Sequence, residues 1–529
     1  MSSPDVAKVS RVRHRTKTKN PSSARVHAAS GSVTNEPPPK GGKPHVVIVG
    51  AGLAGLCAAY RLQVAGCSYT ILEADKVRIG GRAFTARFKD GLYGELGAMR
   101  IPSQHEATLR YVRDFDLTLR KFVLNSENAF VYARGHRERR SDVLKLTQHY
   151  EMRPWERTQT PDQLWGYAVD KHLETLTDEE RKDLRESNSF KTKKIGDIDH
   201  LSVRQLIDLS GLSGEAIEYL LMGTGNRTLQ HIAATEFLRE DLIGLWSDDN
   251  FQEIVGGTER LPQAFLERLQ VKPKMGCQVI ALEQDRDKKR ATAVYRVDGK
   301  DEQESGDFVL CAIPFPALDR MDFPPGTKRC FGGPKSRAIR EAWYESSIKI
   351  LVPTSRRFWE LDEKRPIYGG VSNTDLLVGS IHYPSDNAQE RNKDVSNGPG
   401  VLLLSYNWGQ DARRLGTLTK TQRERLAVHV AAAVHPELRE DGVVRWDDVA
   451  SWPWDNHPWA GAAFAFYLPG QFSNLHQDVI APEGRIHFAG EHCSRAQTWM
   501  QGALESAENA VAAMLAEWKQ THKVEQKVG

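Results

Sequence analysis

The stretch 45-HVVIVGAGLAGLCAAYRLQVAG-66, followed by 68-SYTILEAD-75, decides the fold of this chain. HVVIVG is a short continuous apolar run, which is typical of a strand in a parallel sheet that is covered on both faces. The residues after it read as a helix with a Gly-rich start, and Gly66 is expected to end that helix. SYTILEAD predicts a second strand. Together these segments predict a β-α-β unit within about 30 residues.

Three glycines lie between the first strand and the helix in a GxGxxG pattern. Gly50 permits a tight turn, Gly52 leaves the backbone open to a pyrophosphate, and Gly55 lets the helix pack close to the strand. Glu73 ends the second strand, where its carboxylate can accept hydrogen bonds from a ribose diol and would repel a 2′-phosphate. A glycine turn in an α/β domain that binds no nucleotide is the alternative, but strand, glycines, helix, strand and acid all occur in order.

A second glycine motif, Gly80-Gly81-Arg82, follows seven residues after Glu73. In many FAD proteins such a sequence brings backbone N–H groups and an arginine to the same pyrophosphate. Nothing in a nicotinamide enzyme requires it. The motif therefore favours FAD over NAD, and the carboxylate of Glu73 argues against NADP.

The composition excludes several classes of protein. The chain has 529 residues, of which 40% are hydrophobic and 27% charged, an ordinary globular mixture. Its net charge is +3, but residues 1–44 hold nine Lys or Arg and two acids, so the remainder is acidic and is not a basic nucleic-acid binder. The six cysteines show no zinc spacing, and no metal site is expected.

The basic leader, residues 1–44, predicts a disordered extension, because it has almost no large apolar residues to bury. A nucleic-acid arm, a tail for an acidic partner and an organelle transit peptide are the functional alternatives. No apolar run is long enough to span a membrane, and the N-terminus shows no apolar core of a secretory signal. We expect a cytoplasmic protein.

Four motifs in order carry a family resemblance. They are VVIVGAGLAGL with LEAD and IGGR, GELGAMRIP at Gly94–Pro102, EIVGGTERLP at Glu253–Pro262, and GRIHFAGEHCSRAQTWMQGALESAENA near the C-terminus. With them the sequence resembles the flavin amine oxidase superfamily, specifically the L-amino-acid oxidases, from about His45 to about Leu515.

The resemblance implies a mixed α/β architecture with three parts. A Rossmann-type FAD-binding domain would be assembled from residues 45–100, 251–330 and 456–517. A substrate-binding sheet domain would comprise 101–150 and 331–455, and a helical domain 151–250. Residues 518–529 would form a frayed tail, and a homodimer is the family habit.

The resemblance also implies which residues bind FAD. The backbone of Val279 would meet the adenine, and Gly490 and Glu491 would lie at the ribityl and phosphate end. Ala462 stands where monoamine oxidases carry the cysteine that holds FAD covalently, so non-covalent FAD is expected. The residues predicted to contact FAD are Gly50, Gly52, Leu53, Ala54, Gly55, Glu73, Ala74, Gly80, Gly81, Arg82, Gly97, Ala98, Met99, Arg100, Val279, Trp452, Gly490, Glu491, Thr498 and Trp499.

Three polar residues resemble the family's reacting groups. Arg100, in GAMRIP, would pair its planar fork with a substrate carboxylate, and Tyr406 would donate to the other carboxylate oxygen. Lys349 resembles the lysine that holds a water beneath flavin N5, and a lysine in an apolar strand is costly to bury without a partner. The alternatives are a structural salt bridge for Arg100, a core tyrosine, and an edge lysine that reaches solvent.

Four further residues are candidates for the substrate cage. Trp499 falls where the family has an aromatic lining residue, and Thr498 stands where venom oxidases carry glycine, with a carbonyl that can accept from the substrate amine. Trp452 and Trp459 are either cage residues or plain core aromatics.

The implied reaction is oxidative deamination of L-α-amino acids. Hydride would pass from the α-carbon to flavin N5, giving a 2-oxo acid, ammonia and hydrogen peroxide, with a rate that rises with pH to a plateau. An amine or polyamine oxidase, an amino-acid 2-monooxygenase on the same fold, and a non-catalytic FAD- or partner-binding protein are the alternatives. The preferred side chain is not visible in the sequence.

Overall fold

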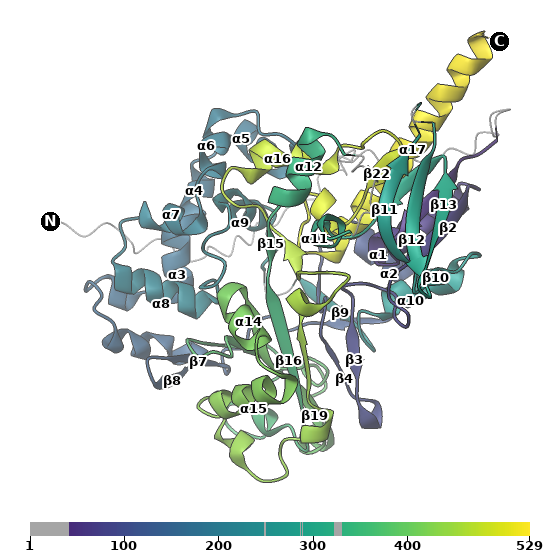
Figure 1. Cartoon of the computed structure of the whole chain (residues 1–529). Coiled ribbons are helices and arrows are strands. Elements are labelled where there is room, and N and C mark those ends of the chain that lie inside the picture. Colours follow the sequence, from purple (N-terminus) through teal and green to yellow (C-terminus); the bar gives the residue numbers. More distant parts are fainter. Residues whose placement is uncertain (1–41, 248–249, 286, 288, 322–330, 529) are drawn as a thin grey trace, which may run out of the picture.

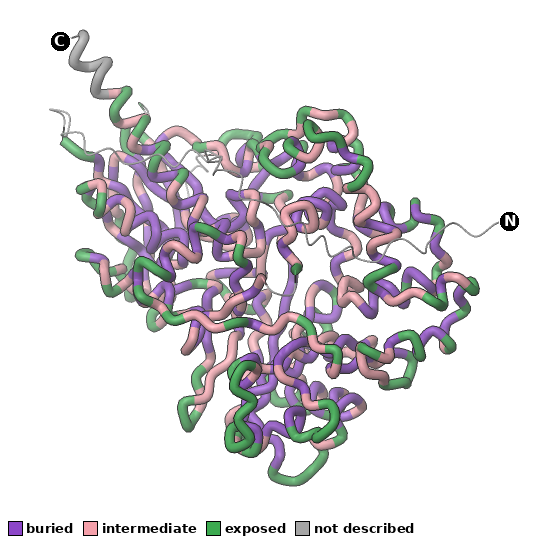
Figure 2. Tube along the Cα trace, turned by 180° about the vertical axis from the view of Figure 1, so that it is seen from behind, coloured by how far each residue is buried: buried purple, intermediate pink, exposed green. Residues whose placement is uncertain are grey.

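The computed structural model describes residues 42–247, 250–285, 287, 289–321 and 331–528 (Figure 1). The predicted leader, apart from its last three residues, lies outside the described residues, and so does Cys330. Buried segments run through the interior of the protein, and exposed residues gather at its periphery (Figure 2).

A five-stranded parallel sheet forms the centre of the nucleotide-binding part. Its strand order is β10 (Lys274–Met275), β2 (Ser68–Glu73), β1 (His45–Val49), β14 (Phe308–Cys311) and β22 (Ile486–Phe488). These strands come from three distant stretches of sequence. The order places β1, with its glycine turn, between β2 and β14. The β-α-β unit is thereby joined to a strand from the C-terminal half of the chain.

Both faces of this sheet are covered, which explains the continuous apolar run at its start. Val46 and Ile48 pack among helix residues such as Leu504 of α17 (Met500–Val528). Val47 and Val49 pack on the opposite face. That face is covered by the antiparallel strands β11 (Gln278–Gln284), β12 (Ala291–Val297) and β13 (Lys300–Gly306).

The helix after β1 is α1 (Leu53–Val64), and its start depends on glycine. Gly50 has a φ of +100°. A Cβ on Gly55 would lie 1.9 Å from the Gly50 carbonyl oxygen, so only glycine permits this close approach of helix and strand. The predicted β-α-β unit is therefore confirmed.

A seven-stranded sheet forms the second layer. Its order is β20 (Ala450–Pro453), β16 (Ser347–Thr354), β19 (Gly400–Trp408), β18 (Ser380–His382), β17 (Val371–Thr374), β7 (Phe130–Ala133) and β8 (His136–Arg139). Helices α14 (Gly409–Gly416) and α15 (Lys420–Ala431) pack against it (Figure 1). Strand β16, which lies between β20 and β19, is buried along its whole length.

Helices dominate residues 161–242. They are α3 (Pro161–Trp165), α4 (Lys171–Glu174), α5 (Asp178–Glu186), α6 (Lys193–Asp199), α7 (Val203–Asp208), α8 (Gly214–Thr224) and α9 (Ala234–Leu242). The sequences TDEE and SVRQ form capping boxes at the start of two of these helices: Thr177 with Glu180 opens α5, and Ser202 with Gln205 opens α7.

The C-terminal helix departs from one expectation. A frayed tail was predicted from residue 518, but α17 continues to Val528 and projects from the body of the protein (Figure 1). Among the described residues, no helix combines the length and apolarity that a membrane span requires.

Short strands bring the remaining motifs to the boundary between the layers. The hairpin β3 (Thr85–Arg87) and β4 (Tyr93–Glu95) precedes the GAMR stretch, and β5 (Ile101–Pro102) follows it. β9 (Phe251–Ile254) pairs with β5 and with β6 (Leu119–Lys121). The motif GELGAMRIP therefore lies between the nucleotide-binding sheet and the seven-stranded sheet.

Candidate active site

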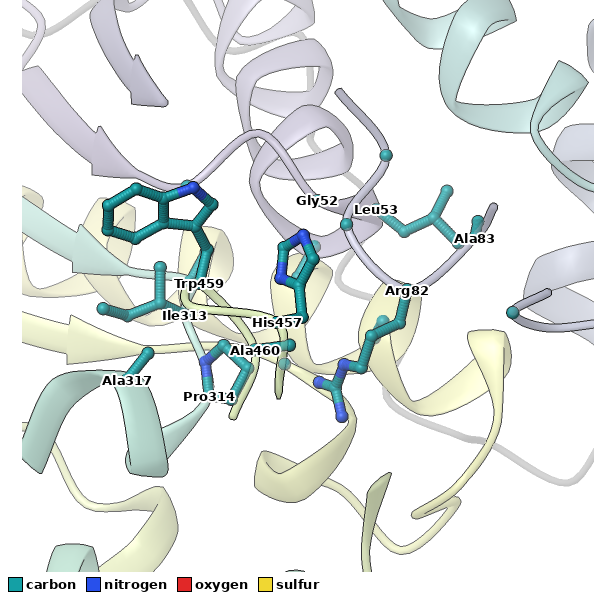
Figure 3. Close-up of a pocket in the computed structure, with 18 of the residues that line it drawn as sticks. Gly52, Leu53, Arg82, Ala83, Ile313, Pro314, Ala317, His457, Trp459 and Ala460 are labelled. Carbon is teal, nitrogen blue, oxygen red and sulfur yellow. The ribbon is translucent and has the colours of Figure 1, made fainter. Parts of the chain in front are cut away.

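A cavity of about 490 Å³ runs from the glycine turn after β1 to the buried face of β16 (Figure 3). Most predicted cofactor residues line it, and so do the predicted substrate residues Lys349, Tyr406 and Trp459. Predicted residues that do not line it are Gly55, Met99, Arg100 and Trp452. Gly55 acts instead in the packing of α1 on β1.

At the nucleotide end, the walls form a backbone cradle. The two glycine motifs lie side by side, with a bridge between Gly52 and Gly80, and a Cβ on Gly52 would meet only the Cα of Gly81, 4.0 Å away. Glu73 lies beside this cradle and accepts the N–H groups of Ala51 (2.6 Å) and Asp75 (2.8 Å). Burial raises the pKa of Glu73. Each carboxylate oxygen has further acceptor capacity, which suits a ribose diol.

Two buried ring nitrogens that can donate lie near the cavity without a partner in the described part of the chain, and of the two residues only His457 lines it. The Nε1 of Trp452 and the Nδ1 of His457 have no hydrogen-bond partner among the described residues, and their rings lie 5.5 Å apart. His457 lines the cavity beside Trp459 and Arg82 (Figure 3). Because buried polar atoms are usually satisfied, the cradle and these donors fit a bound dinucleotide.

We predict that Gly52→Val weakens FAD binding at least tenfold, about 1.4 kcal/mol. Gly52 has a φ of −71°, which valine adopts, and the Cβ of the new side chain would meet no protein atom closer than 4.0 Å, so the side chain would occupy the cradle. Fluorescence titration of the apoprotein with FAD measures the effect. Gly196→Ala, in open space on α6, is the matched control and should leave FAD affinity unchanged; equal affinity in both variants would contradict the prediction.

Glu491 joins three separate segments of the cavity wall. It pairs with Arg82 (2.7 Å) and accepts the backbone N–H groups of Ala465 (3.0 Å) and Thr498 (2.9 Å). Arg82 also donates to the carbonyl of Ala463. Arg82 and Glu491 both line the cavity as predicted, and their direct pairing was not foreseen.

Thr498 has a φ of +73°, a left-handed conformation that β-branched residues rarely adopt. Such strain is of order 1–3 kcal/mol and concentrates at functional sites. A glycine would adopt this φ without strain. The conformation directs Trp499 to the cavity end formed by Lys349 and Tyr406.

Three predicted residues form a row across the seven-stranded sheet. Lys349 of β16 is paired in register with Tyr406 of β19 on one side and with Trp452 of β20 on the other. Residues paired across neighbouring strands project from the same face. The Lys349 ammonium lies 4.4 Å from the Tyr406 ring centroid, and these two residues of the row line the cavity end.

Lys349 is only 2% exposed, so the solvent-reaching alternative is excluded. Its Nζ donates to the carbonyl of Gly97 at 2.6 Å. Burial lowers the pKa of Lys349 to about 7, although the charge of Glu95 opposes this. Burial raises the pKa of Glu95 to about 7, against the hydrogen bonds that it accepts from Thr258 and Thr85. Lys349 therefore has a neutral amine available near neutral pH.

Arg100 lies in an aromatic box. Its guanidinium carbon is 5.2 Å from the ring of Trp246, 5.6 Å from Phe251 and 5.9 Å from Phe122. Among the described residues, no carboxylate lies within ion-pair distance of it and its side chain donates no hydrogen bond. Burial lowers its pKa, opposed by the charges of Tyr406 and Glu240. The predicted alternative, a structural salt bridge, is not what the described residues show.

Two residues near this end were missed by sequence reasoning. Glu240 of α9 accepts the indole N–H groups of Trp246 (2.8 Å) and Trp499 (3.1 Å). The ring of His382 lies 5.7 Å from Tyr406, and its pKa is well below the usual value because of burial and the charges of Arg100 and Lys349. No local motif marks either residue, since their partners lie on other elements.

Comparisons with known proteins identify the family of this chain. The family model for flavin-containing amine oxidoreductases matches residues 53–515. An L-amino-acid oxidase of Siganus canaliculatus is 32% identical over 479 residues, covering 88% of this chain and 84% of that protein. An L-amino-acid oxidase of Bothrops moojeni is 31% identical over 468 residues, covering 87% of each chain.

The structure of a putrescine oxidase bound to putrescine superposes with a TM-score of 0.68 at 19% identity, over 90% of this chain and 99% of that one. The fold and the cavity thus define a flavin-dependent oxidoreductase. The chain belongs to the family of flavin-containing amine oxidoreductases, and its cofactor is FAD.

Proposed function

We propose that this enzyme oxidises L-α-amino acids to 2-oxo acids with release of ammonia and hydrogen peroxide. The observation that carries the proposal is the state of Arg100, a guanidinium in an aromatic box with no carboxylate partner among the described residues. A charge buried without its counterion is unfavourable, and a substrate carboxylate would supply the counterion through a bidentate pair. The L configuration is supported by the relatives, which are named L-amino-acid oxidases.

Bound FAD, held without a covalent bond, supplies the acceptor for the hydride of the substrate Cα. The chain's own residues orient the substrate. Arg100 and Tyr406 are proposed to bind the carboxylate, and the carbonyl of Thr498 to accept from the amine. Trp499 lines the same cavity as Lys349 and Tyr406 and is proposed to limit the space beside the Cα.

Lys349 is proposed to handle a proton at its Nζ during the reaction of the reduced enzyme with oxygen. With a pKa near 7 the amine is neutral for much of the physiological range, and it can then accept a proton from a water hydrogen-bonded to it. The Gly97 carbonyl and the neighbouring Tyr406 ring fix its position.

An amine oxidase is the second candidate, because structural neighbours include putrescine oxidase. An amine has no carboxylate to offer Arg100, and a diamine would bring a second positive charge to it. Each oxygen of Glu240 already accepts an indole N–H, so this carboxylate is not free to pair with a second ammonium group. These charges favour an amino acid.

Product analysis tests the proposal against its alternatives. The enzyme should convert an L-amino acid to equal amounts of 2-oxo acid, ammonia and peroxide. An amide with loss of carbon dioxide would indicate a monooxygenase, and turnover of amines alone would indicate an amine oxidase. If neither amino acids nor amines give a product, the protein would be a binding protein and not an oxidase. A homodimer and a cytoplasmic location stay predictions from the sequence.

A further inference from the structure

Glu240 lies close to Arg100 but does not pair with it. The carboxylate is on α9, 5% exposed, and its negative charge favours the charged form of Arg100. In a box of aromatic rings, attraction between such charges is much stronger than in water. A direct pair between Glu240 and Arg100 would nevertheless occupy the fork that the proposed function assigns to the substrate.

Two indole groups account for the separation. Oε2 of Glu240 accepts Trp246 Nε1 at 2.8 Å, and Oε1 accepts Trp499 Nε1 at 3.1 Å. One donor therefore engages each oxygen, and hydrogen bonds to a charged acceptor are the strong kind. The two indole rings pack against each other with centroids 5.8 Å apart, which fixes both donors relative to the carboxylate.

The same two tryptophans contact the substrate site. The ring of Trp246 lies beneath the Arg100 guanidinium, and Trp499 lines the cavity. The ring of Phe251, from β9, supports both. We call Glu240 and its two indole donors, Trp246 and Trp499, the clamp. Through α9, the clamp joins the helical part to the residues proposed to bind substrate.

We propose that the indole N–H groups of Trp246 and Trp499 hold Glu240 away from Arg100 and thereby keep the arginine open for carboxylate ligands. Trp246, Trp499 and Glu240 are positioning residues that act through Arg100. The inference rests on the proposed role of Arg100. It predicts that removal of one indole donor lets Glu240 compete with the substrate carboxylate.

Trp246→Phe is the first test, because phenylalanine keeps an aromatic ring under Arg100 and removes only the donor. Benzoate, titrated into the FAD-loaded enzyme and followed by the flavin absorbance change, is the probe. We expect its dissociation constant to rise about tenfold in Trp246→Phe and the KM for amino acids to rise with it, with kcat little changed. Trp499→Phe should act in the same direction.

Glu240→Gln in the Trp246→Phe background is the deciding variant. A neutral amide offers Arg100 no counterion, so the double variant should bind benzoate within about threefold of the wild type. Unchanged benzoate affinity in Trp246→Phe would overturn the inference. Weak binding that Glu240→Gln fails to restore would also overturn it, because the indole would then act through packing alone.

Arg100→Ala separates this inference from the proposed function. If Arg100→Ala leaves benzoate affinity intact, the proposed function fails at its first step. If Arg100→Ala abolishes binding and Trp246→Phe does not weaken it, the proposed function stands and the clamp is wrong. Thermal unfolding of each variant confirms that the compared proteins are folded.

Discussion

Arg100→Ala is expected to lower kcat/KM for L-amino acids about a thousandfold. Removal of one member of a buried, hydrogen-bonded charge pair leaves the other charge without its partner, and losses of 2–5 kcal/mol are typical. A thousandfold change corresponds to about 4 kcal/mol. Steady-state peroxide formation with a good amino-acid substrate measures the effect.

Arg100→Lys and a carboxylate-free substrate serve as controls. Lysine keeps the charge but not the planar fork, so it should recover only part of the activity. Benzylamine, which has no carboxylate, should be oxidised no more slowly by Arg100→Ala than by the wild type. Equal losses on benzylamine and on amino acids would show that Arg100 supports the fold of the site and does not bind substrate.

Lys349→Met is expected to slow the reaction of the reduced enzyme with oxygen about a hundredfold, at the low end of what a positioned acid–base group contributes. Methionine fits the buried strand position without a charge to desolvate. Stopped-flow mixing of reduced enzyme with oxygenated buffer measures this step separately from substrate oxidation. Loss confined to substrate oxidation would contradict the assigned role.

The lowered pKa of Lys349 also predicts how the rate of the oxygen reaction changes with pH. Burial lowers the pKa of Lys349 to about 7, so the ammonium form prevails only below that pH and the neutral amine above it. If the neutral amine accepts the proton, the oxygen reaction of the wild type slows as pH falls through 7. Lys349→Met should lose this inflection. An inflection of the same size in the variant would assign it to another group.

The parts of this protein that sequence reasoning found are those with local signals. The β-α-β unit is marked by three glycines within six residues, Gly50, Gly52 and Gly55. They permit the tight turn, an open backbone for the nucleotide, and the close packing of the helix on the strand. The mixed α/β fold and the FAD cofactor agree with the family that the chain belongs to. Local capping boxes were likewise readable, because donor and acceptor lie three residues apart.

The parts that it missed depend on partners far apart in the chain. Glu240 and Trp499 are separated by 259 positions, and Arg82 and Glu491 by 409. The alignment of Lys349 with Tyr406 and Trp452 is a matter of strand register. Periodicity within one segment carries no information about which distant side chain completes a hydrogen bond. The continuation of α17 to Val528 was also missed. The last residues of the chain are polar, and that composition favours a frayed end.

Anaerobic reduction of the bound flavin tests the central claim most directly. The FAD-loaded enzyme is mixed without oxygen with each proteinogenic L-amino acid, several D-enantiomers, benzylamine and spermine, and the visible flavin absorbance is followed. We predict rapid bleaching by one or more L-amino acids and only slow bleaching by the amines. Bleaching by the amines alone would contradict an amino-acid oxidase.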